Sequence, residues 1–130
     1  MNPAFPDPLV FRHIGTRNGS MILQITEEFR YLSTIHGEIR VPAHFLTDGA
    51  SVPRVFWSLF SPFGEYFGAA LIHDYLYSPN NRRFDRATCD RIFLDAMKDA
   101  GVSWIKRHTI YRAVRLGGWS SFRGTSHHQE

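Results

Sequence analysis

The pattern of apolar and polar positions along this 130-residue chain changes near residue 53. Before that point, short runs rich in β-branched and aromatic residues are separated by turn residues such as Asn18-Gly19 and His36-Gly37. This pattern is typical of antiparallel strands joined by tight turns. We expect strands over residues 9–14, 21–26 and 29–35, and a hairpin partner for the last of these over 38–41.

After residue 53 the pattern becomes helical, and helices are expected over residues 53–60, about 65–77, 85–101 and 103–116. Pro53 suits the first turn of a helix, Asp85 is a suitable N-cap, and Gly101 is a suitable helix end. The sequence therefore predicts an α+β fold, with a small N-terminal antiparallel sheet or hairpins followed by a three- to four-helix bundle.

The composition predicts one compact domain. The chain is 43% hydrophobic and 15% aromatic, which is enough for a core, so we expect a single domain over 1–130 with flexible tails at 1–8 and 119–130. A lone Cys89 cannot form an intramolecular disulfide, which fits a reducing compartment. The N-terminus is interrupted by prolines, so we expect neither a signal peptide nor a transmembrane segment.

The candidate chemistry lies in residues 70–77, where a His-Asp pair interrupts an apolar run. His73, Asp74 and Tyr77 fall on one face of the expected helix. Asp90 lies within the apolar stripe of the following helix and should point inward. Because a short turn makes the two helices antiparallel neighbours, Asp90 could reach a ring nitrogen of His73 or the hydroxyl of Tyr77. Such a contact would fix the tautomer of His73 and raise its basicity.

Two other readings of these residues stay open. The same side chains fit a satisfied core network that pins one helix to the next, and they also fit a surface for partner recognition. Arg107 lies near the apolar stripe of the last helix and is expected to pair with Asp90 or Asp74, whereas Arg112 and Arg115 are expected on the solvent side. The net charge of +3 is mild and no nucleic-acid motif is present, so nucleic-acid binding is disfavoured.

The loop over residues 44–54 is rich in Thr, Asp, Gly and Ser, whose oxygens and backbone groups could ligate a hard cation or bind an oxyanion. The alternative is that Asp48 forms an Asx-turn and Ser51 caps the next helix.

Three blocks of the chain, in this order, resemble an uncharacterised family of tailed-phage and prophage proteins. They are Thr47-Asp48-Gly49-Ala50-Ser51-Val52-Pro53-Arg54 with Phe56-Trp57, then Ala70-Leu71-Ile72-His73-Asp74-Tyr75-Leu76-Tyr77, then Arg83 with Asp90-Arg91-Ile92-Phe93. The resemblance implies a phage origin, a location in the host cytoplasm or the virion, and other phage proteins as candidate partners. The chain departs from the family pattern at His44, where Gly is usual before the Phe.

The helix pair also resembles the active-site helices of calcium-dependent phospholipases A, which carry His-Asp-x-x-Tyr on one helix and an Asp on the next. The resemblance implies that His73 activates water, that Asp74 binds calcium or another divalent metal, and that Tyr77 and Asp90 support His73. The glycine-rich calcium loop of those enzymes has no clear counterpart here, and Asp48 is its candidate substitute as a metal ligand.

Together these observations predict a metal-assisted hydrolase with a His73/Asp90 dyad and Asp74 as metal ligand. Its expected substrate is an ester or amide of the host envelope, in lipid or in peptidoglycan. The alternative is a noncatalytic virion or host-interaction module in which the His-Asp network is structural.

Overall fold

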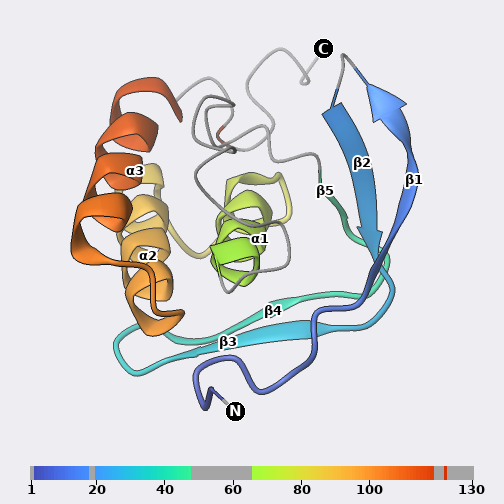
Figure 1. Cartoon of the computed structure of the whole chain (residues 1–130), viewed down its shortest axis with the longest axis horizontal. Helices are drawn as coiled ribbons and strands as arrows, with labels where there is room; N and C mark the ends of the chain where they lie inside the picture. The colour runs from blue at the N-terminus through green and yellow to red at the C-terminus, as the bar shows by residue number, and fades with distance from the viewer. Residues whose placement is uncertain (1, 18–19, 48–65, 119–121, 123–130) are drawn as a thin grey trace. The chain divides into compact units, whose positions relative to one another are not determined.

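The computed structural model describes residues 2–17, 20–47, 66–118 and 122, and the chain divides into two compact units, residues 1–48 and 49–130 (Figure 1). The described part of the first unit contains strands and that of the second contains helices, so the predicted α+β class is confirmed. One domain over 1–130 stays a prediction, and the helix expected over 53–60 lies outside the described residues. The elements are β1 (Phe11–Arg17), β2 (Ser20–Ile25), β3 (Phe29–Ser33), β4 (Gly37–Val41), β5 (Leu46–Thr47), α1 (Tyr66–Tyr77), α2 (Arg86–Asp99) and α3 (Trp104–Gly117).

One sheet of the first unit has the strand order β1-β2-β5, with both pairs antiparallel. The first strand starts later and runs further than expected, because it stays paired with β2 as far as the Arg17 and Ser20 pair. Strand β5 was not expected from the sequence. It has only two residues, which pair with Leu23 and Gln24, and so short a strand carries no readable alternation.

The second sheet is the predicted hairpin of β3 and β4, in which Ser33 pairs with Gly37. Strand β3 ends two residues before the expected end. The hydroxyl oxygen of Ser33 accepts hydrogen bonds from the backbone N–H groups of Ile35 and His36, at 3.2 and 2.9 Å, and these bonds shape the turn. Gly37 then adopts a φ of 84°, a conformation that glycine reaches without steric cost.

The N-terminal segment contacts β3, although residues 1–8 were expected to form a flexible tail. The Phe5 ring stacks on Tyr31 with ring centroids 4.9 Å apart, and on Phe29 at 5.9 Å. Asp7 accepts two hydrogen bonds from the guanidinium of Arg30, at 2.8 and 2.9 Å. Stacking and a two-point ion pair together restrain this segment within the unit.

His44 has a φ of 78°, in the left-handed region that favours glycine. A glycine would adopt this conformation without steric cost, whereas a side chain with a Cβ atom rarely does. The His44 backbone is held on both sides, because its N–H donates to Ile25 at 2.7 Å and its carbonyl accepts from the Gln24 side chain at 3.3 Å.

In the second unit all three described helices begin within one residue of the expected position. The side chain of Asp85 caps α2 by accepting from the Thr88 N–H at 2.8 Å, and Ser103 caps α3 by accepting from the Lys106 N–H at 3.4 Å. Such caps satisfy N–H groups that the first helical turn leaves unbonded. None of the described helices has the length and apolarity needed to cross a bilayer.

Helix α2 packs against both α1 and α3 (Figure 1). The interfaces are built from aliphatic and aromatic side chains that are almost fully buried, which is the main source of helix stability in a small unit. These side chains are Ala69, Leu71, Ile72 and Leu76 of α1, Ile92, Phe93, Ala96 and Met97 of α2, and Ile110 and Val114 of α3.

The turn between α1 and α2 depends on the buried side chain of Asn81. Its amide nitrogen donates to the carbonyls of Leu76 at 2.8 Å and Phe84 at 3.0 Å. Its amide oxygen accepts from the backbone N–H groups of Arg83 at 2.9 Å and Phe84 at 3.2 Å. This side chain therefore determines how α2 returns alongside α1.

We expect Asn81→Ala to lower the free energy of unfolding by about 2–3 kcal/mol, because it leaves buried backbone groups without their hydrogen bonds. The matched control is Asn80→Ala at the neighbouring exposed position, with an expected change within about 0.5 kcal/mol. Urea denaturation measures both. Equal effects at the two positions would contradict the role given to Asn81.

Candidate functional site

A polar cluster lies buried between α1 and α2. His73 and Tyr77 come from α1 and Asp90 from α2, and each is at most 1% exposed. The Nε2 atom of His73 lies 2.8 Å from Oδ1 of Asp90, and the Tyr77 hydroxyl donates to the same oxygen at 2.5 Å. The structure thus brings together the three side chains that the helical spacing placed on facing surfaces.

Arg115 of α3 completes the cluster by donating from a guanidinium nitrogen to the other Asp90 oxygen, Oδ2, at 2.7 Å. Arg107 was expected to pair with Asp90 or Asp74; for Asp90 this prediction is wrong, because Arg115 is its partner. The placement of Arg115 on the solvent side is also wrong. Arg107 donates instead to the backbone carbonyl of Val102 at 3.0 Å. Asp90 lies near the start of α2, which faces the end of α3, so an arginine in the first turn of α3 is too far away.

Arg86, in the first turn of α2, binds the end of α3. Its guanidinium donates to the carbonyls of Val114 at 2.8 Å and Arg115 at 2.6 Å. The last carbonyls of a helix have no partner within it and carry negative partial charge, so a cation is stabilising there. Sequence reasoning missed Arg86; its position four residues before Asp90, on the same face of α2, was the available signal.

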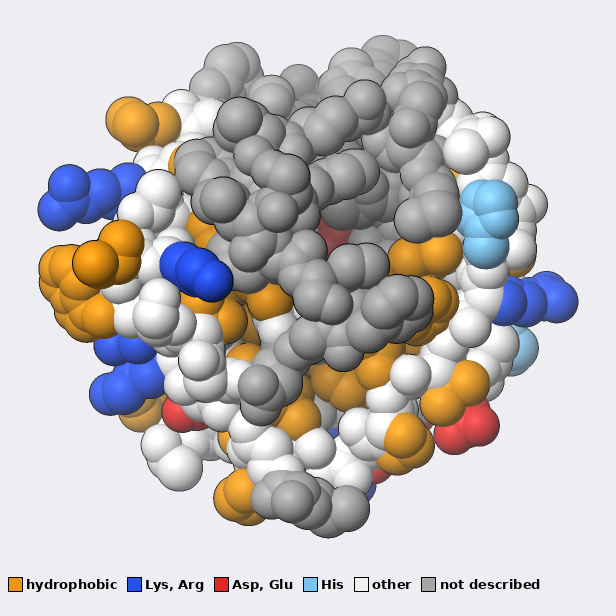
Figure 2. Space-filling view, viewed as in Figure 1, with side chains coloured by type: hydrophobic (Ala, Val, Ile, Leu, Met, Phe, Trp, Pro, Cys, Tyr) orange, Lys and Arg blue, Asp and Glu red, His pale blue; other side chains and the backbone are white. Residues whose placement is uncertain are grey.

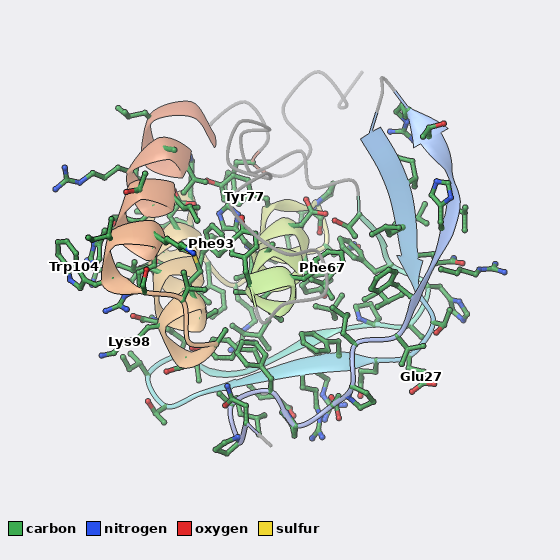
Figure 3. The ribbon with its side chains drawn as sticks, viewed as in Figure 1. Glu27, Phe67, Tyr77, Phe93, Lys98 and Trp104 are labelled. Atoms are coloured by element: carbon green, nitrogen blue, oxygen red, sulfur yellow. The ribbon has the colours of Figure 1, made fainter. Side chains whose placement is uncertain are left out.

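Tyr77 is enclosed by aromatic rings and by backbone, and Figure 3 shows it lying in the helical unit with Phe93. Its ring centroid lies 4.2 Å from that of His73 and 5.2 Å from that of Phe122, the latter in an edge-to-face arrangement. A Cβ atom at Gly118 would lie 2.8 Å from the Tyr77 hydroxyl oxygen. Glycine at 118 therefore leaves room for the hydroxyl that holds Asp90.

The His73 ring stacks on Phe93 with centroids 4.2 Å apart and 18° between the planes. Its second nitrogen, Nδ1, is buried and has no hydrogen-bond partner in the part of the chain that the structure describes. With Asp90 ionised, Nε2 must carry the proton in order to donate to it, so Nδ1 of the neutral ring is a bare acceptor.

The electrostatics of the cluster favour a neutral His73 beside an ionised Asp90. Burial lowers the pKa of His73 below its usual range, and the nearby Arg86 charge lowers it further, while the bond to Asp90 acts in the opposite direction. Burial alone would raise the pKa of Asp90, but hydrogen bonds from His73, Tyr77 and Arg115 bring it below its ordinary value. Burial and the bond to Asp90 raise the pKa of Tyr77, so its hydroxyl stays protonated.

Comparison with known proteins identifies the family but no activity. Residues 23–114 match the family described as "Protein of unknown function (DUF1353)". The chain belongs to this family. "Uncharacterized protein y4jT" of Sinorhizobium fredii (strain NBRC 101917 / NGR234) is 38% identical over 80 residues, which are 60% of this chain and 23% of that relative. No solved structure is significantly similar to this DUF1353 chain.

Of the two expected metal ligands in this DUF1353 chain, the structure describes one. Asp74 follows His73 on α1 and is half-buried, whereas Asp48 lies outside the described residues. Among the residues with described positions, no three His, Cys, Asp or Glu side chains gather closely enough to hold a metal ion. Asp74 is thus the one described carboxylate of the two expected ligands, and their role as a metal site stays a prediction.

We expect His73 to be the Nε2-protonated tautomer at pH about 7.5 and to take up its second proton only below the usual value of about pH 6.5, because burial lowers its pKa. The ring ¹⁵N shifts from two-dimensional NMR report both properties, and His73→Asn assigns the signals. A proton on Nδ1 at neutral pH would contradict this geometry.

The same shift has a consequence for stability. A folded-state pKa below the unfolded value means that the neutral His73 contributes its full stabilisation above pH about 6.5, and that this is lost as the pH falls from there toward the folded-state value.

Proposed function

We propose that the chain is a hydrolase in which His73 acts as the general base and Asp90 orients it, and that its substrate is an ester or amide of the host envelope. A phage or prophage origin belongs to the same proposal and rests on the motif resemblance alone. The proposal is supported most strongly by one observation: Nδ1 of the buried His73 has no hydrogen-bond partner among the described residues, while its other nitrogen is bound to a carboxylate.

This observation favours catalysis over a purely structural network. Buried polar atoms in proteins are almost always hydrogen-bonded, and the exceptions are concentrated where chemistry or a water molecule uses them. A network serving only to join α1 to α2 would gain stability by satisfying Nδ1. A general base needs the opposite arrangement, with one nitrogen anchored and the other ready to accept a proton from water.

In the proposed reaction, Nδ1 of His73 takes a proton from a water molecule while the water oxygen attacks the carbonyl carbon. The His73 ring becomes an imidazolium, which the ionised Asp90 stabilises through Nε2–H. The bond from the carbonyl carbon to the leaving oxygen or nitrogen then breaks, and His73 returns the proton to the leaving group. Tyr77 and Arg115 are positioning residues that hold the two oxygens of Asp90.

A divalent metal held by Asp74 would polarise the substrate carbonyl and stabilise the oxyanion, as in the phospholipases that the helix pair resembles. The second expected ligand, Asp48, lies outside the described residues. Within the described residues, Asp74 fits this role in residue type and in its place beside His73.

The alternative function, a noncatalytic virion or host-interaction module, is favoured by a different observation. His73 and Asp90 have no exposed surface, as expected for a network that only joins helices. The hydrolase proposal therefore requires that the protein surface above Nδ1 opens to admit substrate and water.

We expect Asp90→Asn to lower the rate of hydrolysis by about 10²–10⁴-fold. An amide nitrogen facing Nε2 would donate to it, which moves the His73 proton to Nδ1 and removes the base. The assay uses three probes, namely p-nitrophenyl butyrate, phosphatidylglycerol and purified peptidoglycan. Asp99→Asn, at an exposed position of the same helix, is the matched control and should keep the wild-type rate.

Arg115→Met tests the positioning role of Arg115. Because Asp90 loses a hydrogen bond, the substitution should shift the pH dependence of the hydrolysis rate and also lower the maximal rate. If the wild-type protein turns over none of the three probes, the hydrolase proposal is wrong and the noncatalytic module replaces it.

We expect one divalent ion, with calcium the leading candidate, to raise the melting temperature of the chelated protein, because a ligand of the native state stabilises it by mass action. Asp74→Asn should abolish this rise without changing the melting temperature in chelator by more than a few degrees. Titration with calcium, magnesium, manganese and zinc identifies the ion. A rise that persists in Asp74→Asn would remove Asp74 from the metal site.

A further inference from the structure

The outer face of α3 carries large apolar side chains that the packing of the helices does not use. Trp104 is 61% exposed, Ile105 72% and Leu116 83%. Ile105 and Leu116 are eleven residues apart, close to three full helical turns, so they lie along one line on the helix surface. Trp104 flanks this line and stacks on His108 with centroids 4.4 Å apart. Figure 3 shows Trp104 projecting from α3 on the side away from α1.

The stretch of sequence that contains this face carries charges of one sign. From residue 101 to residue 129 the sequence contains five Lys and Arg residues and no Asp or Glu. Lys106 and Arg112 are exposed on α3, and Arg112 lies seven residues from Ile105, about two turns along the same line. Figure 2 shows blue and orange side chains side by side at the edge of the helical unit where α3 lies.

We infer that this face of α3 is a docking surface for an anionic lipid bilayer. Helices that bind in the plane of a membrane interface combine bulky apolar side chains on one face with lysines and arginines beside them. Here Ile105, Leu116 and the Trp104 ring would enter the boundary between headgroups and acyl chains. The exposed cations would meet lipid phosphates, with the Arg112 stem extending along the apolar surface.

The observations favour a bilayer over a nucleic acid. Lipid phosphates and nucleic-acid phosphates would be met by the same cations of α3, of which Arg115 and Arg107 already donate to Asp90 and to a backbone carbonyl. The apolar part of the face separates the two partners, because binding to a nucleic acid depends mainly on neutralised phosphates. The exposed Trp104 ring could stack on a base, but Ile105 and Leu116, the more exposed pair, have no flat ring for stacking and suit an acyl environment. This surface does not depend on the proposed hydrolase activity and is tested without it.

The test is co-sedimentation of the whole protein with vesicles of phosphatidylcholine alone, or of phosphatidylcholine and phosphatidylglycerol in equal parts. The wild-type protein should bind the anionic vesicles at least about tenfold more tightly than the neutral ones. The double substitution Ile105→Gln with Leu116→Gln should weaken that binding by at least about tenfold. Because both side chains are exposed, the variant should keep the wild-type melting temperature.

The matched control is Ile35→Gln, which removes an isoleucine that is 74% exposed in the β3–β4 turn and should leave vesicle binding unchanged. Equal binding by wild type and the double variant would overturn the proposal, as would failure of the wild type to bind anionic vesicles. Binding to a short DNA duplex but not to vesicles would assign the face to nucleic acid instead. A wild-type dimer that the double variant converts to a monomer, without vesicle binding, would assign it to a second copy of the chain.

Discussion

The buried carboxylate of Asp90 is the constraint on which the arrangement of the helices depends. Removing an ion from water costs several kcal/mol, and the cost is met only when both oxygens have well-placed partners. Those partners are His73 and Tyr77 on one neighbouring helix and Arg115 on the other. Losing any of the three contacts would leave part of a charge unpaired in the core, so this one side chain fixes how α1 and α3 lie against α2.

The same carboxylate determines the state of His73. Burial opposes any charge on the ring, and the bond to Asp90 favours one, so the two effects compete at a single nitrogen. Burial prevails in the resting protein, which leaves the ring neutral with its proton on Nε2. An imidazolium formed during a reaction would find the compensating charge already in place. A group that is neutral at rest and can be stabilised when protonated is suited to acid–base chemistry.

The core of the cluster was predictable from sequence because its elements are local and periodic. A His-Asp pair in an apolar run, a tyrosine four residues after the histidine, and an aspartate within the next apolar stripe each carry a signal at helical spacing. Arg115 was not predictable in this way. Helical periodicity places its Cα near the solvent boundary, but its side chain, 34% exposed, is long enough to bring the guanidinium back to Asp90. Strand β5 was missed for another reason, since its two residues pair only through long-range contact with β2.

The two faces of helix α3 have different roles, so substitutions on the two faces have different consequences. Its inner face supplies Arg115 to a buried network in which stability and chemistry depend on the same bonds, so a substitution there changes both at once. Its outer face carries Ile105 and Leu116, which are mostly in solvent and contribute little to packing. A change in binding caused by substitutions on that face can therefore be interpreted without correction for unfolding. A substitution of Asp90 changes stability as well as activity. A loss of activity in Asp90→Asn is therefore interpreted together with the change that this substitution causes in the tautomer of His73.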